Sequence, residues 1–234
     1  MNLTGKRALI TGGSEGIGYG VAKALLEEGA VVAINGRDQA KLEKAAAELD
    51  CLAIRGDVGI EAAAIAIVDT FVKEVGGIDV LINNAGYGIF RPLVELELAE
   101  LAAQYRTNVF GAFLMAREAA KHFVKQESGH LVNISSTAGT KGFAGGTAYA
   151  SSKFALRGMS ECWRDELRRH NVRVIHVNPS EVQTPFAQKA SGRERPYSDK
   201  KLRPDEIADA IVGALKIDDR GFIPEFSVFA TNPF

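Results

Sequence analysis

The sequence contains little cysteine and almost no net charge. Its two cysteines, Cys51 and Cys162, are too few and too far apart for a disulfide framework or a thiolate metal site. The 28 Lys and Arg residues nearly balance the 29 Asp and Glu residues, for a formal net charge of −1. Such a balance gives no electrostatic reason to bind nucleic acid or an anionic membrane. We therefore expect no metal, no nucleic acid and no membrane among its ligands.

Long hydrophobic runs are also missing. No apolar run reaches the roughly 18 residues that span a bilayer, and residues 1–7 lead into the first apolar run without a signal-peptide core. A cytoplasmic protein is the expectation. The length of 234 residues and the hydrophobic content of 46% are ordinary for a globular chain. We find no linker or internal repeat and expect a single domain over residues 1–234.

Short apolar runs alternate with longer amphipathic stretches. The runs predicted as strands cover residues 7–11, 31–35, 51–55, 78–82, 130–135 and 172–178, with a further strand within 217–234. Helical periodicity covers 17–28, 39–49, 60–75, 98–124, 149–170 and 204–215. Continuous apolar strands separated by helices are typical of a parallel sheet covered on both faces. The pattern predicts an α/β fold with a doubly wound sheet of about seven strands.

A glycine-rich turn joins the first predicted strand to the first helix. Glycines at such a turn allow a tight bend and a close approach of the backbone to a pyrophosphate at a helix amino terminus. The spacing G-x-x-x-G-x-G differs from the commoner dinucleotide fingerprint, and glycine also serves turns without ligands. The position after the first strand favours a cofactor site. Its candidate residues are Gly12, Ser14, Glu15, Gly16, Ile17 and Gly18.

The end of the second strand indicates which dinucleotide would bind. An acidic residue there accepts hydrogen bonds from a ribose 2′-hydroxyl, whereas arginine suits a 2′-phosphate. This chain has Gly36 and Arg37 at that point, which favours NADP(H) over NAD(H). Glu15 in the turn and Asp38 next to Arg37 oppose this preference, and an arginine that merely caps a solvated loop is the alternative.

The next two strands end in further candidate cofactor residues. Asp57, which precedes Val58, is placed to hydrogen-bond an adenine amino group or simply to begin the next helix. The fourth strand runs into Asn84, Ala85 and Gly86, which form either a plain turn or the lining of the cofactor crevice, with Asn side chains bracing neighbouring loops.

Tyr149 and Lys153 are four residues apart and therefore share one face of a predicted helix. A neighbouring ammonium favours the phenolate and is expected to lower the tyrosine pKa towards the range of a general acid/base. Ser136, thirteen residues upstream, ends an apolar run, so its hydroxyl can face the same space. The pair alone is typical of many helix surfaces; the rest of the chain favours a catalytic site.

Asn108 lies within the apolar helical stretch 98–124, and a buried asparagine needs a partner. It holds either a bend or a water that connects Lys153 to solvent. After the sixth strand, Pro179 and Val182 offer backbone groups to a nicotinamide carboxamide, and Thr184 a hydroxyl to a phosphate. Residues 185–205 are basic and poorly periodic, typical of a substrate loop or a solvated one.

Together these motifs resemble the short-chain dehydrogenase/reductase family. They are the Thr11 glycine turn, the Asn-Asn-Ala-Gly stretch at 83–86, Asn108, Ser136 and the pair Tyr149-x-x-x-Lys153. The resemblance extends over about residues 6–184. It implies a Rossmann-type fold and a catalytic tetrad formed by Asn108, Ser136, Tyr149 and Lys153. Tyr149 and Lys153 would also contact the cofactor.

The resemblance further implies reversible hydride transfer between a nicotinamide and a carbonyl carbon. Ser136 would polarise the substrate oxygen and Tyr149 would donate the proton. Lys153 would lower the tyrosine pKa and hold the ribose hydroxyls, while Asn108 would fix a relay water. A small-molecule ketone, aldehyde or alcohol is the expected substrate. No metal is required.

The most similar functional branch is that of the 3-oxoacyl-[acyl-carrier-protein] reductases. Their carrier-docking positions correspond here to Glu127 and His170, so a carrier-bound substrate is possible but not favoured. Ser180 also replaces the family's usual glycine after the sixth strand. A dinucleotide-binding redox sensor without catalysis is a minor alternative, although both Tyr149 and Lys153 are present.

The resemblance implies a homodimer or homotetramer built on the 98–124 and 149–170 helices. Several phenylalanines in the tail, including Phe222, Phe226, Phe229 and Phe234, indicate an interface as well. Substrate identity is not readable, because the segments expected to line the pocket, 87–93, 140–146 and 186–203, match no pattern.

Overall fold

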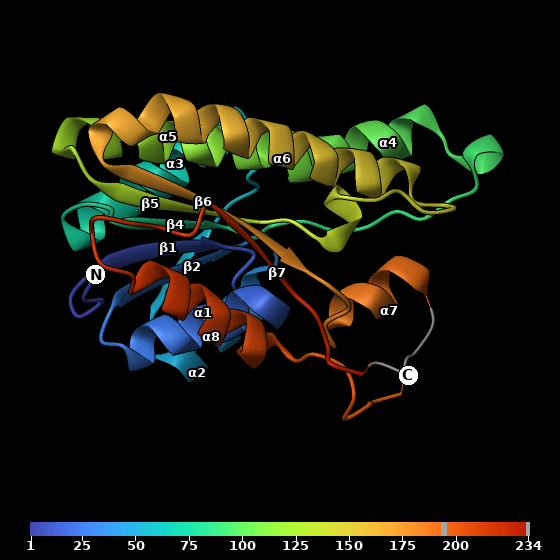
Figure 1. The fold of residues 1–234 in the computed structure, drawn as a ribbon, viewed down its shortest axis with the longest axis horizontal. Helices are drawn as coiled ribbons and strands as arrows, with labels where there is room; N and C mark the ends of the chain where they lie inside the picture. Colours follow the sequence, from blue (N-terminus) through green and yellow to red (C-terminus); the bar gives the residue numbers. More distant parts are fainter. Residues whose placement is uncertain (193–195, 233–234) are drawn as a thin grey trace.

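The computed structural model describes residues 1–192 and 196–232, and their strands form one parallel sheet (Figure 1). Its strand order is β3-β2-β1-β4-β5-β6-β7. The strands are β1 (Arg7–Thr11), β2 (Val31–Gly36), β3 (Leu52–Arg55), β4 (Val80–Asn83), β5 (Gly129–Ile134), β6 (Val172–Pro179) and β7 (Glu225–Val228). The reversal of strand order at β1 and β4 confirms the predicted doubly wound, Rossmann-type sheet.

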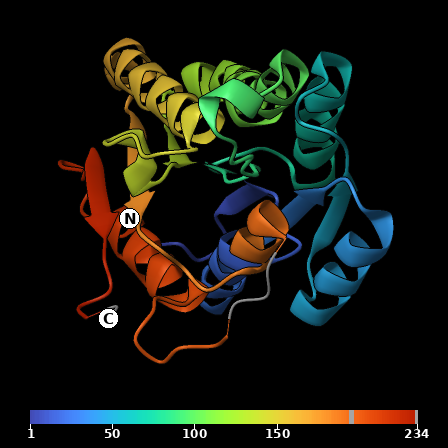
Figure 2. The same cartoon turned by 90° about the vertical axis from the view of Figure 1, so that its right-hand side faces the viewer.

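Helices cover both faces of this sheet (Figures 1 and 2). The α-helices are α1 (Gly16–Glu27), α2 (Gln39–Leu49), α3 (Glu61–Val75), α4 (Leu98–Tyr105), α5 (Ala112–Gln126), α6 (Thr147–Leu167), α7 (Pro185–Ser191) and α8 (Pro204–Leu215). Short 3₁₀ turns are η1 (Leu93–Glu95), η3 (Thr137–Gly139) and η4 (Arg168–His170). α1, α2 and α8 lie on one face, and α3, α5 and α6 on the other.

The strands are continuously apolar because each contributes to two cores. In β1, Ala8 and Ile10 point into the core beneath α1 and α8, whereas Leu9 points into the core beneath α3 and α5. All three are fully buried. A parallel sheet between two helical layers requires this arrangement.

The stretch 98–124, predicted as one helix, is not a continuous α-helix. α4 ends at Tyr105, a π-helical segment η2 (Arg106–Gly111) follows, and α5 continues from Ala112. A π-helical turn adds a residue to the helix and locally re-aims side chains. Asn108 lies within η2, so its direction is set by this irregularity.

The predicted substrate loop also contains a helix, so its description as a poorly periodic loop is wrong for residues 185–191. Thr184 caps α7, its hydroxyl oxygen accepting a hydrogen bond from Phe186 N at 3.3 Å, and Pro185 is the first helical residue. Proline at this position after a threonine cap is a favourable helix start. Residues 193–195 of the predicted loop lie outside the described residues.

The carboxyl-terminal region contributes β7 to the edge of the sheet. Phe222 and Phe226 pack against the core beneath α1 and α8, while Phe229 is 65% exposed. Phe234 lies outside the described residues. Among the helices of the described ranges, none is long and apolar enough to cross a membrane.

Candidate active site

The predicted site residues follow the carboxyl ends of successive strands. The turn at 12–18 follows β1, Arg37 follows β2, Asp57 follows β3, residues 84–86 follow β4 and Ser136 follows β5. The sheet is parallel, so these ends share one edge, which is where ligands bind in doubly wound folds.

The glycine-rich turn is packed so tightly that side chains would not fit. Gly12 and Gly16 have φ of +64° and +60°, a region that favours glycine. A Cβ on Gly12 would lie 2.9 Å from the Ala85 Cα, and one on Gly18 would lie 2.4 Å from the Gly12 carbonyl oxygen. Glycine at these positions therefore allows the turn, α1 and the loop after β4 to meet.

Asn84 braces the same turn. Its Nδ2 donates to the carbonyls of Thr11 and Gly12, both at 3.0 Å. The Thr11 hydroxyl in turn accepts from the backbone N–H groups of Asn84 and Ala85, both at 3.0 Å. Bracing of neighbouring loops was one of the two predictions for these residues. Gly86 lies close to Asn108, since its Cβ would be 3.2 Å from Asn108 Oδ1.

The amino terminus of α1 is suited to an anion. Glu15 is the N-cap residue of α1. Among the described residues, no capping side chain accepts a hydrogen bond from the N–H groups of the first helical turn. Such groups and the helix dipole favour a phosphate. The Glu15 carboxylate, which would repel a phosphate, is paired with Lys189 of α7. Ile17 packs against the core. The turn therefore fits a dinucleotide pyrophosphate.

Arg37 and Asp57 meet beyond the ends of β2 and β3. Arg37 Nη1 lies 3.7 Å from Asp57 Oδ2, and the arginine side chain is 59% exposed. A Cβ on Gly36 would lie 3.6 Å from Ser14 Oγ, so position 36 faces the glycine-rich turn. Asp57 also accepts a hydrogen bond from Gly59 N at 2.9 Å, so it helps to start the approach to α3.

The side chain of Val58 does not face this edge of the sheet. It is buried in the core beneath α3 and α5. A Cβ on Gly111 of η2 would lie only 2.7 Å from its Cγ2. Val58 can therefore contact a ligand only through its backbone.

The segment after β6 closes against the glycine-rich turn. Pro179 ends β6, and Val182 forms an isolated parallel bridge with Leu202. A Cβ on Gly16 would lie 3.3 Å from Thr184 Cγ2, which places Thr184 beside the start of α1. Ser180, where the family usually has glycine, donates its N–H to Val228 O at 2.9 Å, so it extends the pairing with β7.

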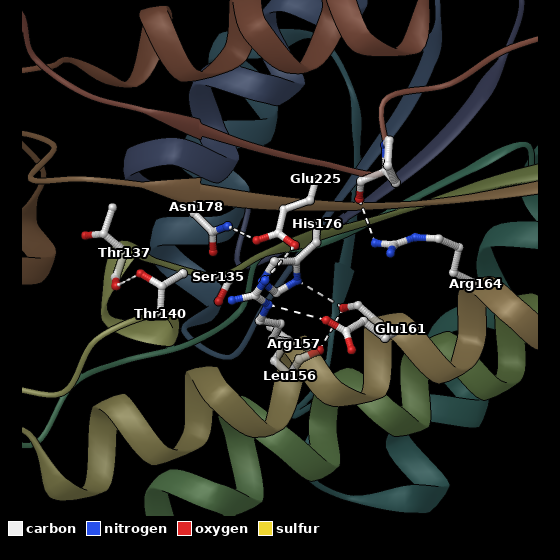
Figure 3. A network of polar contacts seen from close by, with 12 residues as sticks. Ser135, Thr137, Thr140, Leu156, Arg157, Glu161, Arg164, His176, Asn178 and Glu225 are labelled. Atoms are coloured by element: carbon white, nitrogen blue, oxygen red, sulfur yellow. Dashed lines mark hydrogen bonds and ion pairs between the residues drawn. The ribbon is translucent and has the colours of Figure 1, made fainter.

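A polar network holds the carboxyl end of β6 (Figure 3). Asn178 Nδ2 donates to Glu225 Oε1 of β7 at 2.9 Å. Arg157 of α6 lies 3.3 Å from the other oxygen of Glu225 and 3.4 Å from Glu161. Asn178 precedes Pro179 directly, so these contacts between β6, β7 and α6 fix the backbone at the proposed nicotinamide end of the site.

Tyr149 lies in the first turns of α6, with Ser136 beside it. Burial raises the pKa of the Tyr149 phenol to about 12, and a hydrogen bond with the Ser136 hydroxyl opposes this rise. The expected lowering of the tyrosine pKa is therefore wrong in direction. The physical reason is desolvation, which disfavours the phenolate. Sequence spacing placed the residues together but carried no information on how deeply the ring is buried.

Lys153 is buried one turn after Tyr149. Its Nζ lies 5.8 Å from the centre of the Tyr149 ring and donates to the carbonyl of Ile134 at 2.9 Å. Burial lowers the pKa of this ammonium from 10.5 to about 8. The lysine therefore still carries a proton at neutral pH, although its environment disfavours the charge.

Asn108 is held by three hydrogen bonds. Its Nδ2 donates to Tyr87 O at 2.9 Å and to Ser152 Oγ at 3.1 Å, and its Oδ1 accepts from Tyr87 N at 3.1 Å. Ser152 in turn donates to Tyr149 O at 2.7 Å. Asn108 is thus connected to α6 close to Tyr149. The contribution of Ser152 was not anticipated, although it lies directly before Lys153.

Three phenylalanines around Tyr149 were also not singled out. The ring centres of Phe90 and Phe186 lie 5.5 and 5.4 Å from that of Tyr149, and Phe143 lies 5.8 Å from Phe90. Each comes from one of the three segments expected to line the pocket. The signal available in the sequence was that each of these three segments contains a phenylalanine.

Within the described ranges, no group of three or more His, Cys, Asp or Glu residues is placed to hold a metal ion.

Comparison with known proteins gives the same assignment over most of the chain. The family model described as short chain dehydrogenase matches residues 6–195. The 3-oxoacyl-[acyl-carrier-protein] reductase of Thermotoga maritima is 31% identical over 234 residues, covering 95% of each chain. An uncharacterized oxidoreductase of Staphylococcus aureus is 31% identical over 216 residues, covering 91% of this chain and 92% of the other.

Solved structures are similar over the whole fold. The alcohol dehydrogenase of the archaeon Thermococcus sibiricus, complexed with 5-hydroxy-NADP, has a TM-score of 0.87 at 28% identity and 97% coverage of both chains. The 3-ketoacyl-(acyl-carrier-protein) reductase of Brucella melitensis, complexed with NADH, has a TM-score of 0.89 at 28% identity, covering 99% of this chain and 100% of the other. Sequence motifs, topology and relatives agree, and the chain belongs to the short-chain dehydrogenase/reductase family of oxidoreductases.

Proposed function

We propose that this protein is an NADP(H)-dependent oxidoreductase that interconverts a ketone or aldehyde and the corresponding alcohol. The observation that supports this most directly is the placement of Tyr149, Ser136 and Lys153. The phenol lies beside the Ser136 hydroxyl and has a buried ammonium one helical turn away. This set can donate a proton to a carbonyl oxygen that gains negative charge.

The cofactor proposal rests on the glycine-rich turn and on Arg37. A reduced nicotinamide supplies a hydride when it is bound. The N–H groups at the start of α1 suit the pyrophosphate. Arg37 suits a 2′-phosphate because its guanidinium is exposed and can leave Asp57 to pair with the more highly charged phosphate. Gly36 provides no carboxylate that would repel that phosphate.

The proton-transfer roles follow from the pKa directions. With a pKa raised to about 12, Tyr149 is protonated at neutral pH and can donate its proton to a substrate oxygen. Ser136 would share the hydrogen bond to the substrate oxygen. Lys153 has three N–H donors, one of which is used on Ile134 O, and would offer the others to ribose hydroxyls.

Asn108 has a narrower role in this proposal. Both hydrogens of its Nδ2 are donated, and Oδ1 accepts one hydrogen bond from Tyr87 N. A carbonyl oxygen accepts two hydrogen bonds, so one lone pair remains for a relay water. Asn108 would thus position that water. The water would return a proton to Tyr149 through Lys153.

Replacement of Tyr149 by phenylalanine tests this function. Tyr149→Phe removes the transferable proton and keeps the ring, so we expect ketone reduction to fall by a factor of about 100 or more. The affinity for NADPH, measured by calorimetry, should remain near that of the wild type. Retained turnover would show that Tyr149 is not the acid. A protein that binds NADPH but reduces no carbonyl compound would indicate a dinucleotide sensor instead.

Reduction of a 3-oxoacyl group on a carrier protein is the second candidate, since relatives in this branch are similar in sequence and structure. The positions expected to dock an acidic carrier are Glu127 and His170, and these two pair with each other at 2.7 Å. Glu127 also carries the wrong charge for such a partner. Turnover of acetoacetyl-carrier protein well above that of simple ketones would favour this candidate.

We also propose a homodimer or homotetramer. Phe110 and Phe113, at the junction of η2 and α5, and Phe154 of α6 are 54%, 40% and 45% exposed. Exposed aromatic residues on adjacent helices are typical of an interface. Light scattering after size-exclusion chromatography should give a dimer or tetramer, and a monomer at micromolar concentration would contradict this proposal.

A further inference from the structure

Two phenylalanines that are distant in sequence pack against the ring of the proposed proton donor, and a third packs against one of them. Phe90 lies between β4 and η1, Phe143 lies between η3 and α6, and Phe186 lies on α7. Phe90 meets Tyr149 edge to face, with ring centres 5.5 Å apart and planes at 80°, and Phe186 meets it at 5.4 Å and 53°. Phe143 packs against Phe90 at 5.8 Å. Aromatic pairs favour such tilted arrangements.

Two glycines make room for these rings. A Cβ on Gly88 would lie 3.0 Å from the Cζ atoms of both Phe90 and Phe186. A Cβ on Gly146, just before α6, would lie 2.7 Å from the Phe143 ring. Larger residues at either position would displace an aromatic ring. The cluster is therefore specified by the chain at several positions and is not a chance contact of one side chain.

The cluster is apolar as well as aromatic. Phe90 and Phe186 pack with Ala138, Tyr149 and Ala150 into a hydrophobic group that is separate from the two main cores. The ring of Tyr149 is therefore packed by aromatic rings and methyl groups.

The charged residue that directly follows Phe90 in the sequence already forms an ion pair. Arg91, directly after Phe90, lies 3.3 Å from Glu100 of α4. Its backbone N–H donates to Gly145 O at 2.9 Å, which ties the Phe90 segment to the segment of Phe143. The two segments thus form one wall, and the guanidinium is neutralised by its partner.

We propose that Phe90, Phe143 and Phe186 select carbonyl substrates with an aromatic ring next to the carbonyl, such as aryl alkyl ketones. This inference rests on the proposed function. In the reaction, a hydride adds to the carbonyl carbon while the Tyr149 proton adds to the oxygen, and the ketone becomes a secondary alcohol as NADPH becomes NADP⁺. The rings stack on the aryl group and orient the carbonyl towards Tyr149. Polyols, sugar phosphates and 3-oxoacyl thioesters lack the group that this wall recognises.

A panel of substrates that differ in the group next to the carbonyl tests the selection. We expect kcat/KM for acetophenone with NADPH to exceed that for 2-butanone and for acetoacetyl-N-acetylcysteamine by about 10- to 100-fold, as burial of a ring implies. Dihydroxyacetone should be poorer still. Equal or higher kcat/KM for the thioester or for dihydroxyacetone would overturn the inference.

Single variants assign the selection to the wall. Phe186→Ala and Phe90→Ala should each reduce the ratio of kcat/KM for acetophenone to kcat/KM for 2-butanone about tenfold. Phe186→Leu, which keeps an apolar side chain, should lose less than Phe186→Ala. Phe229→Ala, at an exposed phenylalanine outside the cluster, serves as the control and should leave the ratio unchanged. A ratio unaffected by both wall variants would contradict the assignment.

A binding measurement separates this inference from the proposed function. Acetophenone cannot react with the NADP⁺ complex, so calorimetric titration of that complex measures recognition without turnover. Saturable binding that weakens in Phe186→Ala supports the wall. Binding of NADPH with reduction of 2-butanone but no acetophenone preference would overturn the wall and leave the proposed function standing. Absence of any dinucleotide binding would overturn both.

Discussion

We expect the buried ammonium of Lys153 to lower the free energy of unfolding of the protein. Lys153 is buried, and its pKa falls from 10.5 to about 8. Since one pKa unit corresponds to about 1.4 kcal/mol, the buried ammonium destabilises the folded state by about 3 kcal/mol at neutral pH. Lys153→Met removes this penalty and keeps a side chain of similar length.

The substitution also removes the hydrogen bond from Nζ to the Ile134 carbonyl, at 2.9 Å. Loss of a partner for a buried carbonyl costs about 1 kcal/mol or somewhat more. We therefore expect a net gain of about 1–2 kcal/mol in the free energy of unfolding. For a domain of this size that corresponds to a rise in Tm of about 4 °C. Activity should be lost, because the ammonium holds the proposed ribose contacts.

The pH dependence distinguishes this explanation from a general packing effect. Below about pH 8 the lysine is protonated in both the folded and the unfolded chain, and the full penalty applies. Between about pH 8 and 10.5 only the unfolded chain retains the proton, so the stability of the wild type rises with pH relative to that of the variant. The gain in the free energy of unfolding from Lys153→Met, measured by urea unfolding, should therefore be smaller at about pH 10 than at about pH 7. A variant less stable than the wild type, or a gain independent of pH, would refute the reasoning.

Two further substitutions test the cofactor side of the site. Arg37→Ala should weaken NADPH binding about tenfold and NADH binding less than about twofold, because only NADPH has the 2′-phosphate; equal weakening in calorimetry would exclude Arg37 as the selector. Gly18→Ala should cost about 1–3 kcal/mol in denaturant unfolding, since its Cβ would lie 2.4 Å from the Gly12 carbonyl. Gly213→Ala, in α8 with nothing within 4 Å of the new Cβ, should instead be neutral or stabilising and is its control.

The sheet and the placement of the motifs could be predicted because they depend on periodicity and on chain order. Apolar runs separated by amphipathic stretches specify strands and helices, and parallel strands bring all of their carboxyl ends to one edge. The glycine-rich turn and the stretch with Asn84 are therefore predicted to line the cofactor crevice, and Ser136 is predicted to face the same space as Tyr149. The structure adds the bonds, such as those from Asn84 to Thr11 and Gly12.

Features that depend on tertiary packing could not be predicted. The π-helical η2 around Asn108 has no periodic signature in the sequence, and its Gly111 packs closely against Val58 of a distant segment. The pKa direction of Tyr149 was wrong for a similar reason. Spacing showed a lysine nearby, but burial beneath Phe90 and Phe186 opposes ionisation, and both rings come from segments without a recognisable pattern.

Calorimetric titration of the purified protein with NADPH and with NADH tests the central claim most directly. The account predicts saturable binding of one NADPH per chain and binding of NADH at least about tenfold weaker, as loss of an arginine–phosphate contact implies. Tighter binding of NADH would contradict the role of Gly36 and Arg37. Binding of neither dinucleotide would contradict the proposed oxidoreductase function itself.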